Sequence, residues 1–200
     1  MADKLLNRRT FLSVGAAATA GALIAPLPVL ADDEEVELLR WDLVHFPQGV
    51  VLPGQDMAKD AATGDVITLT GSGEVEPKKG MATGGGTFLH AHSSGTEVAH
   101  GVYRVTGFTS FTPAGGTLVG LPVRDGIGTL DQTMGGELAL QVTLMPSGGG
   151  ALDGTLEVDC TIPGVELPIE EGVNLSVGSF HFEKAGGATL FHVLHGVNQN

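Results

Sequence analysis

Seven histidines are the residues of this chain whose type could support metal binding or acid–base chemistry. They are His45, His90, His92, His100, His181, His192 and His195. His90 and His92 lie two positions apart, so in a β-strand their side chains would share one face. Three imidazole nitrogens that converge can hold a transition metal and leave one coordination position open. We therefore predict His90, His92 and His100 as metal ligands, with a transition metal as the candidate cofactor.

The register of the hairpin that would carry these three histidines decides whether they meet. A turn over residues 93–95 would place all three imidazoles on one face. A turn of only two residues, 94–95, would pair His92 with Glu97, and His100 would then point the other way. The sequence leaves both registers open, and the alternative to a metal site is a group of exposed polar histidines.

A second pair of histidines, His181 and His192, flanks the dipeptide Gly186-Gly187. A two-residue turn there would place the two imidazoles directly opposite each other on paired strands. The other face of this hairpin would be more apolar and would carry Phe180, Phe182, Phe191 and Val193. We therefore predict that this apolar face lies in the core and that His181 and His192 form a solvated pair.

Bulky apolar residues on the predicted strands provide a candidate ligand site. Trp41 is the only tryptophan and would share a strand face with His45. Ligands are often bound in the mouths of closed sheets. We predict a site lined by Trp41, His45, Phe88 and Phe182, with Leu138 and Leu140 beside them. The alternative is that Trp41 plugs the interior.

The sequence contains no motif for nucleophilic or phosphate chemistry. It has no GxSxG, and Cys160 alternates onto an apolar strand face, which is typical of inert packing. The run Gly84-Gly85-Gly86 lacks the lysine and the helix of a phosphate-binding loop. We predict no catalytic residue, and whether the protein is an enzyme stays open.

Alternation of apolar and polar residues dominates the chain, and helical periodicity is almost absent. One face of a strand would carry Leu138, Leu140, Val142 and Leu144, and the glycine-rich loop 147–150 would join it to a second strand. The pattern predicts strands at 38–46, 65–74, 86–92, 97–108, 116–123, 136–145, 152–160, 173–184 and 188–195, with at most one helical turn at 55–62. We predict an all-β fold, a single closed or nearly closed antiparallel β-barrel of about eight to nine strands, with a β-sandwich as the alternative.

The composition excludes several kinds of partner. The formal net charge is -13, so nucleic acid and anionic membrane surfaces would be repelled. A single cysteine allows no internal disulfide. Glycine occurs 31 times without a collagen period, which favours short strands and tight turns over disorder.

The first residues have the layout of a cleavable export signal. Arg8 and Arg9 precede Phe11 and Leu12, an apolar stretch follows, and small residues lead to Ala31. The run NRRTFLS resembles the twin-arginine signal motif. The resemblance implies export of a folded protein by the twin-arginine translocase, cleavage after Ala31, and a periplasmic or extracellular location. Prolines interrupt the apolar stretch and no cysteine lies at the cleavage site, so we predict no stable membrane anchor.

The predicted organisation is a twin-arginine signal peptide at 1–31, a flexible acidic N-terminus at 32–36, a β-barrel domain at 37–195 and a C-terminal tail at 196–200. The runs GSGEVEP, ATGGGTFLH and HGVYRVTGFTSF resemble an uncharacterised family of small bacterial exported all-β proteins. The layout is also similar to small barrels of the lipocalin and allene oxide cyclase type.

Three hypotheses about function follow. The first is non-catalytic binding of a small apolar ligand by an exported barrel. The second is a metal-binding protein or metal-dependent enzyme that uses His90, His92 and His100. The third is a cyclase or isomerase of the allene oxide cyclase type, which the architectural likeness implies and which no residue supports by itself.

Overall fold

The computed structural model describes residues 36–194, and these residues form strands, turns and loops without an α-helix. The strands are β1 Leu39–His45, β2 Val50–Pro53, β3 Gln55–Asp60, β4 Val66–Thr70, β5 Ser72–Glu76, β6 Met81–Ala91, β7 Glu97–Gly115, β8 Arg124–Asp125, β9 Thr133–Pro146, β10 Leu152–Cys160, β11 Gly172–Val177, β12 Phe180–Gly186 and β13 Thr189–Val193. Single 3-10 turns occur at Pro47–Gly49, Pro77–Lys79 and Leu130–Gln132. Within residues 36–194, no helix is long and apolar enough to span a membrane. The predicted signal residues Arg8, Arg9, Phe11, Leu12 and Ala31, together with His195, lie outside the described residues.

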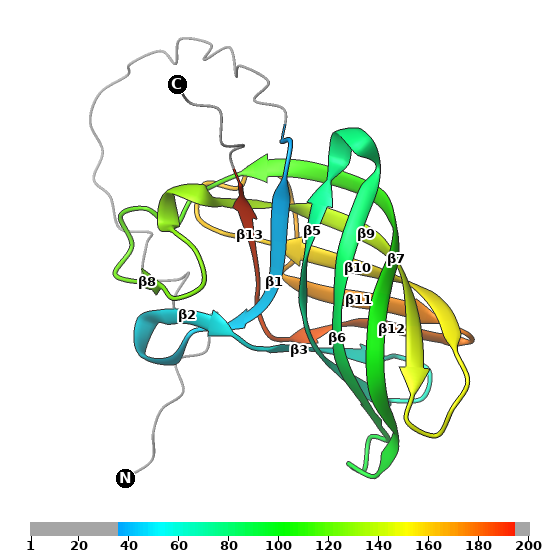
Figure 1. Cartoon of the computed structure of the whole chain (residues 1–200). Coiled ribbons are helices and arrows are strands. Elements are labelled where there is room, and N and C mark those ends of the chain that lie inside the picture. The colour runs from blue at the N-terminus through cyan, green and yellow to red at the C-terminus, as the bar shows by residue number, and fades with distance from the viewer. Residues whose placement is uncertain (1–35, 195–200) are drawn as a thin grey trace, which may run out of the picture. The chain divides into compact units, whose positions relative to one another are not determined.

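The strands pair in one sheet whose hydrogen bonding returns on itself (Figure 1). From β9 the pairing runs through β10, β11, β12, β3 and β4 to β6, and from β6 through β5, β1 and β13 back to β9, which completes a ring of ten strands. β7 lies between β6 and β9 and pairs with both. All these pairs are antiparallel, and only the short β2–β8 pair is parallel. The prediction of an all-β fold is confirmed.

A bend divides the strand that precedes β6 into β4 and β5. Both parts keep one register against β6, with Leu69 opposite Phe88 and Ser72 opposite Gly85. On its other edge this strand pairs first with β3 and then with β1. The bend at Gly71 therefore places β1, which carries Trp41, on one edge of β5, while the glycine-rich part of β6 lies on the other edge.

The core forms where the strands alternate. Leu138, Leu140, Val142 and Leu144 of β9 are all buried, as their spacing predicts. β9 and β10 pair as the predicted hairpin, with Leu156 opposite Leu140. Full burial of each such side chain contributes about 1.5–3 kcal/mol to stability, so these strands supply much of the driving force for folding.

Three element predictions were wrong. The single strand predicted at 173–184 is two strands, β11 and β12, which pair with each other across a turn at 178–179. Residues 55–60 form the strand β3 and not a helical turn. The alternation is hard to see in the sequence because two of the three buried positions, Asp56 and Asp60, are charged and the third is Ala58. Residues 116–123 form no strand and belong to the irregular loop 116–132. This loop buries Leu118 and Val123 in the hydrophobic core, which explains their apolar character without a strand.

Candidate functional site

The predicted ligand-lining residues divide into a buried group and one surface residue. Trp41, Phe88 and Phe182 belong to the core, with 0%, 5% and 2% of their surface exposed. Leu138 and Leu140 are buried in the same core. His45 is exposed at the end of β1. The structure therefore places three of the four predicted residues in the interior and leaves His45 outside it.

Trp41 lies directly against glycine backbone. It pairs with Gly73 of β5, and Gly73 pairs with Gly84 of β6. A Cβ atom on Gly73 would lie 2.7 Å from the indole Nε1, and one on Gly84 would lie 3.0 Å from Cζ2. The indole thus fills space that side chains at these positions would need. Its Nε1 is buried and has no hydrogen-bond partner within residues 36–194.

Tyr103 of β7 contacts the same bend, and sequence reasoning did not select it. A Cβ atom on Gly71 would collide with the Tyr103 hydroxyl group. The side chain is 3% exposed, and burial raises the pKa of the phenol well above its ordinary value. Its hydroxyl oxygen has no hydrogen-bond partner in the described part of the chain. The sequence does contain a pattern that points to Tyr103. It lies two positions from Val105 in β7, so the only tyrosine of the chain shares the buried face of that strand.

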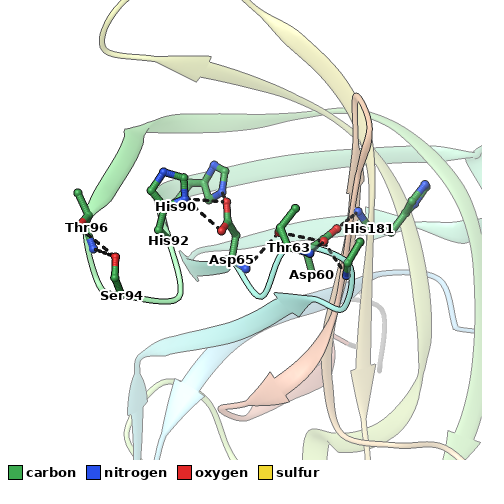
Figure 2. A network of polar contacts seen from close by, with 9 residues as sticks. Asp60, Thr63, Asp65, His90, His92, Ser94, Thr96 and His181 are labelled. Carbon is green, nitrogen blue, oxygen red and sulfur yellow. Dashed lines mark hydrogen bonds and ion pairs between the residues drawn. The ribbon is translucent and has the colours of Figure 1, made fainter.

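A second group of polar side chains gathers where the β3–β4 turn meets the β6–β7 hairpin (Figure 2). Asp65 Oδ2 lies 3.0 Å from His90 Nε2, and Asp65 Oδ1 lies 3.1 Å from His92 Nδ1. Asp65 and His90 are buried, whereas the His92 side chain is 57% exposed. The hydrogen bond from His92 lowers the pKa of Asp65, partial burial acts against it, and His90 lowers it further.

Because the ionised Asp65 carboxylate can only accept hydrogen bonds, an imidazole that carries a single proton must present that N–H to it, which fixes the tautomer of each ring. His90 must carry its proton on Nε2, and His92 must carry its proton on Nδ1. Each ring then keeps a lone pair on its other nitrogen. The His90 ring also lies edge-on to Phe180 and Phe182, with centroids 5.0 and 5.3 Å away. The arrangement can accept a proton or a hydrogen bond beside an aromatic surface.

The turn that carries Asp65 is held by Asp60 (Figure 2). Asp60 Oδ1 accepts hydrogen bonds from the backbone N–H groups of Ala62 and Thr63, at 3.0 and 2.8 Å. Its Oδ2 accepts one from the His181 N–H at 2.9 Å, which ties the turn to β12. The bond from His181 is the largest cause that lowers the Asp60 pKa, followed by the bond from the Thr63 backbone.

His100 does not join the other two predicted metal ligands. Leu89 lies opposite His100 and His90 lies opposite Ala99, so His90 and His100 point to different faces of the hairpin. This is the second of the two predicted registers, with an irregularity near its end. His100 is exposed, and its Nδ1 lies 2.6 Å from Glu97 Oε1. In the described part of the chain, no three His, Cys, Asp or Glu side chains are grouped to hold a metal ion.

The prediction that His181 and His192 form a solvated pair on neighbouring strands was wrong. β12 pairs with β11 and β3, whereas β13 pairs with β1 and β9, so no hairpin joins them at Gly186-Gly187. His192 is 1% exposed rather than solvated. Both faces of β13 are covered, because loop 116–132 packs on one of them: a Cβ atom on Gly128 would lie 2.6 Å from His192 Nε2.

The buried His192 lies between two carboxylates. Its Nε2 is 2.7 Å from Asp125 Oδ2, and its Nδ1 is 3.8 Å from Asp42 Oδ2. Arg40 bonds Asp42 at 2.8 Å and the Ile127 carbonyl at 2.9 Å. Burial lowers the pKa of His192, but Asp42 and Asp125 outweigh it, so the pKa is raised. This group fastens loop 116–132 to β1 and β13.

A scan of the chain against models of protein families gave no match, and searches of the curated proteins and of the solved structures gave none either. The resemblances described above stay predictions.

Proposed function

We propose that the ring of strands closes as a β-barrel and that the protein binds a small, largely apolar molecule in its interior, beside Trp41. A barrel rather than a sandwich is supported by the backbone pairing, which passes from β9 through nine other strands and returns to β9. Such a ring leaves no open edge within its own circuit. Its buried face is apolar and aromatic, the lining that small-molecule sites commonly have.

One observation carries the proposal: the indole N–H of Trp41 is buried, and no acceptor for it lies within residues 36–194. Buried polar groups are nearly always hydrogen-bonded, and each exception costs about 1–3 kcal/mol. An indole nitrogen can only donate, so the missing partner is an acceptor. A bound small molecule would supply this acceptor and bury its apolar part against the same core.

The proposed place of action is outside the cytoplasm. The twin-arginine motif at Arg8 and Arg9 supports it. A domain that completes its ring before export would suit a route for folded cargo. The proposed partners are therefore the translocase during export and the small ligand afterwards.

Native mass spectrometry of the exported protein, purified without detergent or organic solvent, tests the binding function. We expect a mass excess of one small molecule per chain that disappears on unfolding. Trp41→Phe keeps an aromatic ring but removes the donor, and should retain less of that molecule. Gly148→Ala is the matched control, because a Cβ there meets no atom within 4 Å. A bare-chain mass in every preparation would count against ligand binding.

A second candidate function is metal binding by His90 and His92. It is favoured by Asp65, because metal-binding histidines commonly donate their second ring N–H to a carboxylate. Elemental analysis of untagged protein tests it, with His90→Asn and His92→Asn as variants and the exposed His100→Asn as control. Less than about one-tenth equivalent of any transition metal, with no gain in melting temperature when metal is added, would reject this candidate.

A further inference from the structure

Two hydrogen-bond donors of the described residues, not one, lack acceptors near the bend at Gly71, between β4 and β5. Trp41 Nε1 and the Tyr103 hydroxyl oxygen are both buried and unpartnered within residues 36–194. Trp41 comes from β1, on one side of the β5–β6 pair, and Tyr103 comes from β7, on the other. Both rings lie on the same strand, against Gly73 and Gly71 respectively.

The spacing of the two glycines places the two donors near each other. Gly71 and Gly73 are two residues apart, so their inward positions lie about 7 Å apart along the strand. Tyr103 contacts the first position and the indole Nε1 contacts the second. One carbonyl oxygen bonds both donors where the indole Nε1 and the Tyr103 hydroxyl oxygen lie within about 6 Å of each other, which is the length of two hydrogen bonds.

The chemistry of the two donors restricts what that group can be. The indole has no lone pair available to accept a hydrogen bond, and its N–H is not acidic. The phenol stays protonated, because burial raises the pKa of Tyr103 well above its ordinary value. Both side chains therefore offer a proton, and the ligand atom that fits them is an oxygen acceptor.

The buried charges of the described residues argue against an anionic ligand. The buried ionisable side chains other than Tyr103 and Cys160 are carboxylates and histidines, namely Asp42, Asp56, Asp60, Asp65, Asp125, Asp159, His90 and His192. No lysine or arginine is among them. A carboxylate ligand would lose its hydration without gaining a buried lysine or arginine, and the buried His192 already faces Asp42 and Asp125, so the loss would be costly in an apolar interior. A neutral carbonyl oxygen avoids this cost and can accept two hydrogen bonds.

We propose that the ligand is a neutral, mainly apolar molecule whose carbonyl oxygen accepts hydrogen bonds from Trp41 Nε1 and the Tyr103 hydroxyl. This inference rests on the proposed function and adds the chemical class of the ligand. It also gives the glycines at 71 and 73 a role: without a Cβ atom they leave the space that the Tyr103 hydroxyl group and the Trp41 Nε1 occupy.

Three probes with the same number of carbons separate the alternatives: octane, 2-octanone and octanoate. Binding to extracted, ligand-free protein is followed by the emission of Trp41, the only tryptophan. We expect 2-octanone to bind about 5- to 10-fold more tightly than octane, as one or two hydrogen bonds would allow. Octanoate should bind more weakly than the ketone.

Tyr103→Phe removes one donor and keeps the ring. It should weaken 2-octanone binding severalfold and leave octane binding unchanged. Thr109→Val, which removes an exposed hydroxyl from the same strand, is the control and should change neither affinity. A thermal unfolding transition as sharp as that of the wild type shows that a variant is folded.

The outcomes distinguish this inference from the function on which it rests. If octane and 2-octanone bind equally, or Tyr103→Phe weakens both equally, the carbonyl inference is wrong and interior binding stands. If octanoate binds most tightly, the argument from buried charge is wrong. If none of the three probes binds and no small molecule co-purifies, the binding function itself is rejected.

Discussion

His192 Nε2 lies 2.7 Å from Asp125 Oδ2, although the two residues are 67 positions apart and both side chains are almost fully buried. The other ring nitrogen faces Asp42 at 3.8 Å. One imidazole between two carboxylates holds loop 116–132 against β13, and Arg40 balances part of the negative charge. Because of this contact, the free energy of unfolding should decrease as the pH rises.

The first prediction concerns alkaline pH. The pKa of folded His192 is raised above the 6.5 of the free side chain. The imidazolium therefore contributes stability that is fully present below about pH 6.5 and is lost as pH rises through the folded pKa. Urea unfolding at about pH 6 and about pH 9 should show this loss in the wild type. Asp125→Asn should lower the unfolding free energy by about 1.5–3 kcal/mol at the lower pH and flatten the profile.

Glu97→Gln is the control for this titration, because it removes a carboxylate beside an exposed histidine, His100. Exposed pairs contribute little, so its profile should follow that of the wild type. Equal pH dependence in Asp125→Asn and wild type would show that His192 is not the group that titrates.

The second prediction concerns the free energy of unfolding of the ligand-free protein. Tyr103→Phe removes a buried hydroxyl that has no partner among the described residues, so it should stabilise ligand-free protein by about 1 kcal/mol. Chemical denaturation of extracted protein measures this. A destabilised variant would mean that the hydroxyl has a hydrogen-bond partner in the empty protein, and the donor pair would then lose half of its support.

The third prediction concerns the glycine on which the indole lies. A Cβ on Gly73 would press against Trp41 and the backbone of β6, so Gly73→Ala should destabilise the fold by about 1–3 kcal/mol or more. It should also shift the Trp41 emission. Gly148→Ala, in an open loop, should change neither quantity. Near-wild-type stability and emission in Gly73→Ala would contradict the packing described here.

The fourth prediction concerns imidazole tautomers. Long-range nitrogen–proton NMR spectra at neutral pH should show His90 protonated on Nε2 and His92 on Nδ1, because both face the Asp65 carboxylate. Asp65→Asn should abolish this fixed pattern. The spectrum of His181, which lies beyond the reach of Asp65, should be unchanged in its tautomer. The opposite tautomer on His90 in the wild type would contradict the arrangement.

The fifth prediction concerns export. Replacement of Arg8 and Arg9 by lysine should retain the precursor inside the cell, and the exported wild type should begin at Asp32. Mass spectrometry of the exported fraction measures both. Export of the doubly substituted chain in normal amounts would point to a different route.

Much of the fold could be predicted from local alternation. Leu138 to Leu144 and Leu156 to Cys160 were assigned to the correct strands and faces, because one side of each strand is apolar. β3 was missed, because its buried side carries Asp56 and Asp60, whose burial depends on contacts outside the segment.

The site could be predicted only in part. Trp41, Phe88 and Phe182 follow from the pattern of bulky residues in strands. The burial of His192 does not, because it is set by a loop some 67 residues away in sequence. The same limit applies to His100, whose face depends on the register of one hairpin. The burial of His192 and the strand face of His100 depend on contacts between segments far apart in the sequence, so a local sequence pattern does not predict them.

The indole N–H resonance of Trp41 tests the central claim most directly, because a chain with one tryptophan gives one such signal. Its proton shift is compared in exported protein as purified and after the small-molecule content has been extracted. We expect a downfield shift in the loaded protein, from a hydrogen bond to the ligand, that disappears on extraction and returns with 2-octanone. An identical signal in all three samples would contradict the account.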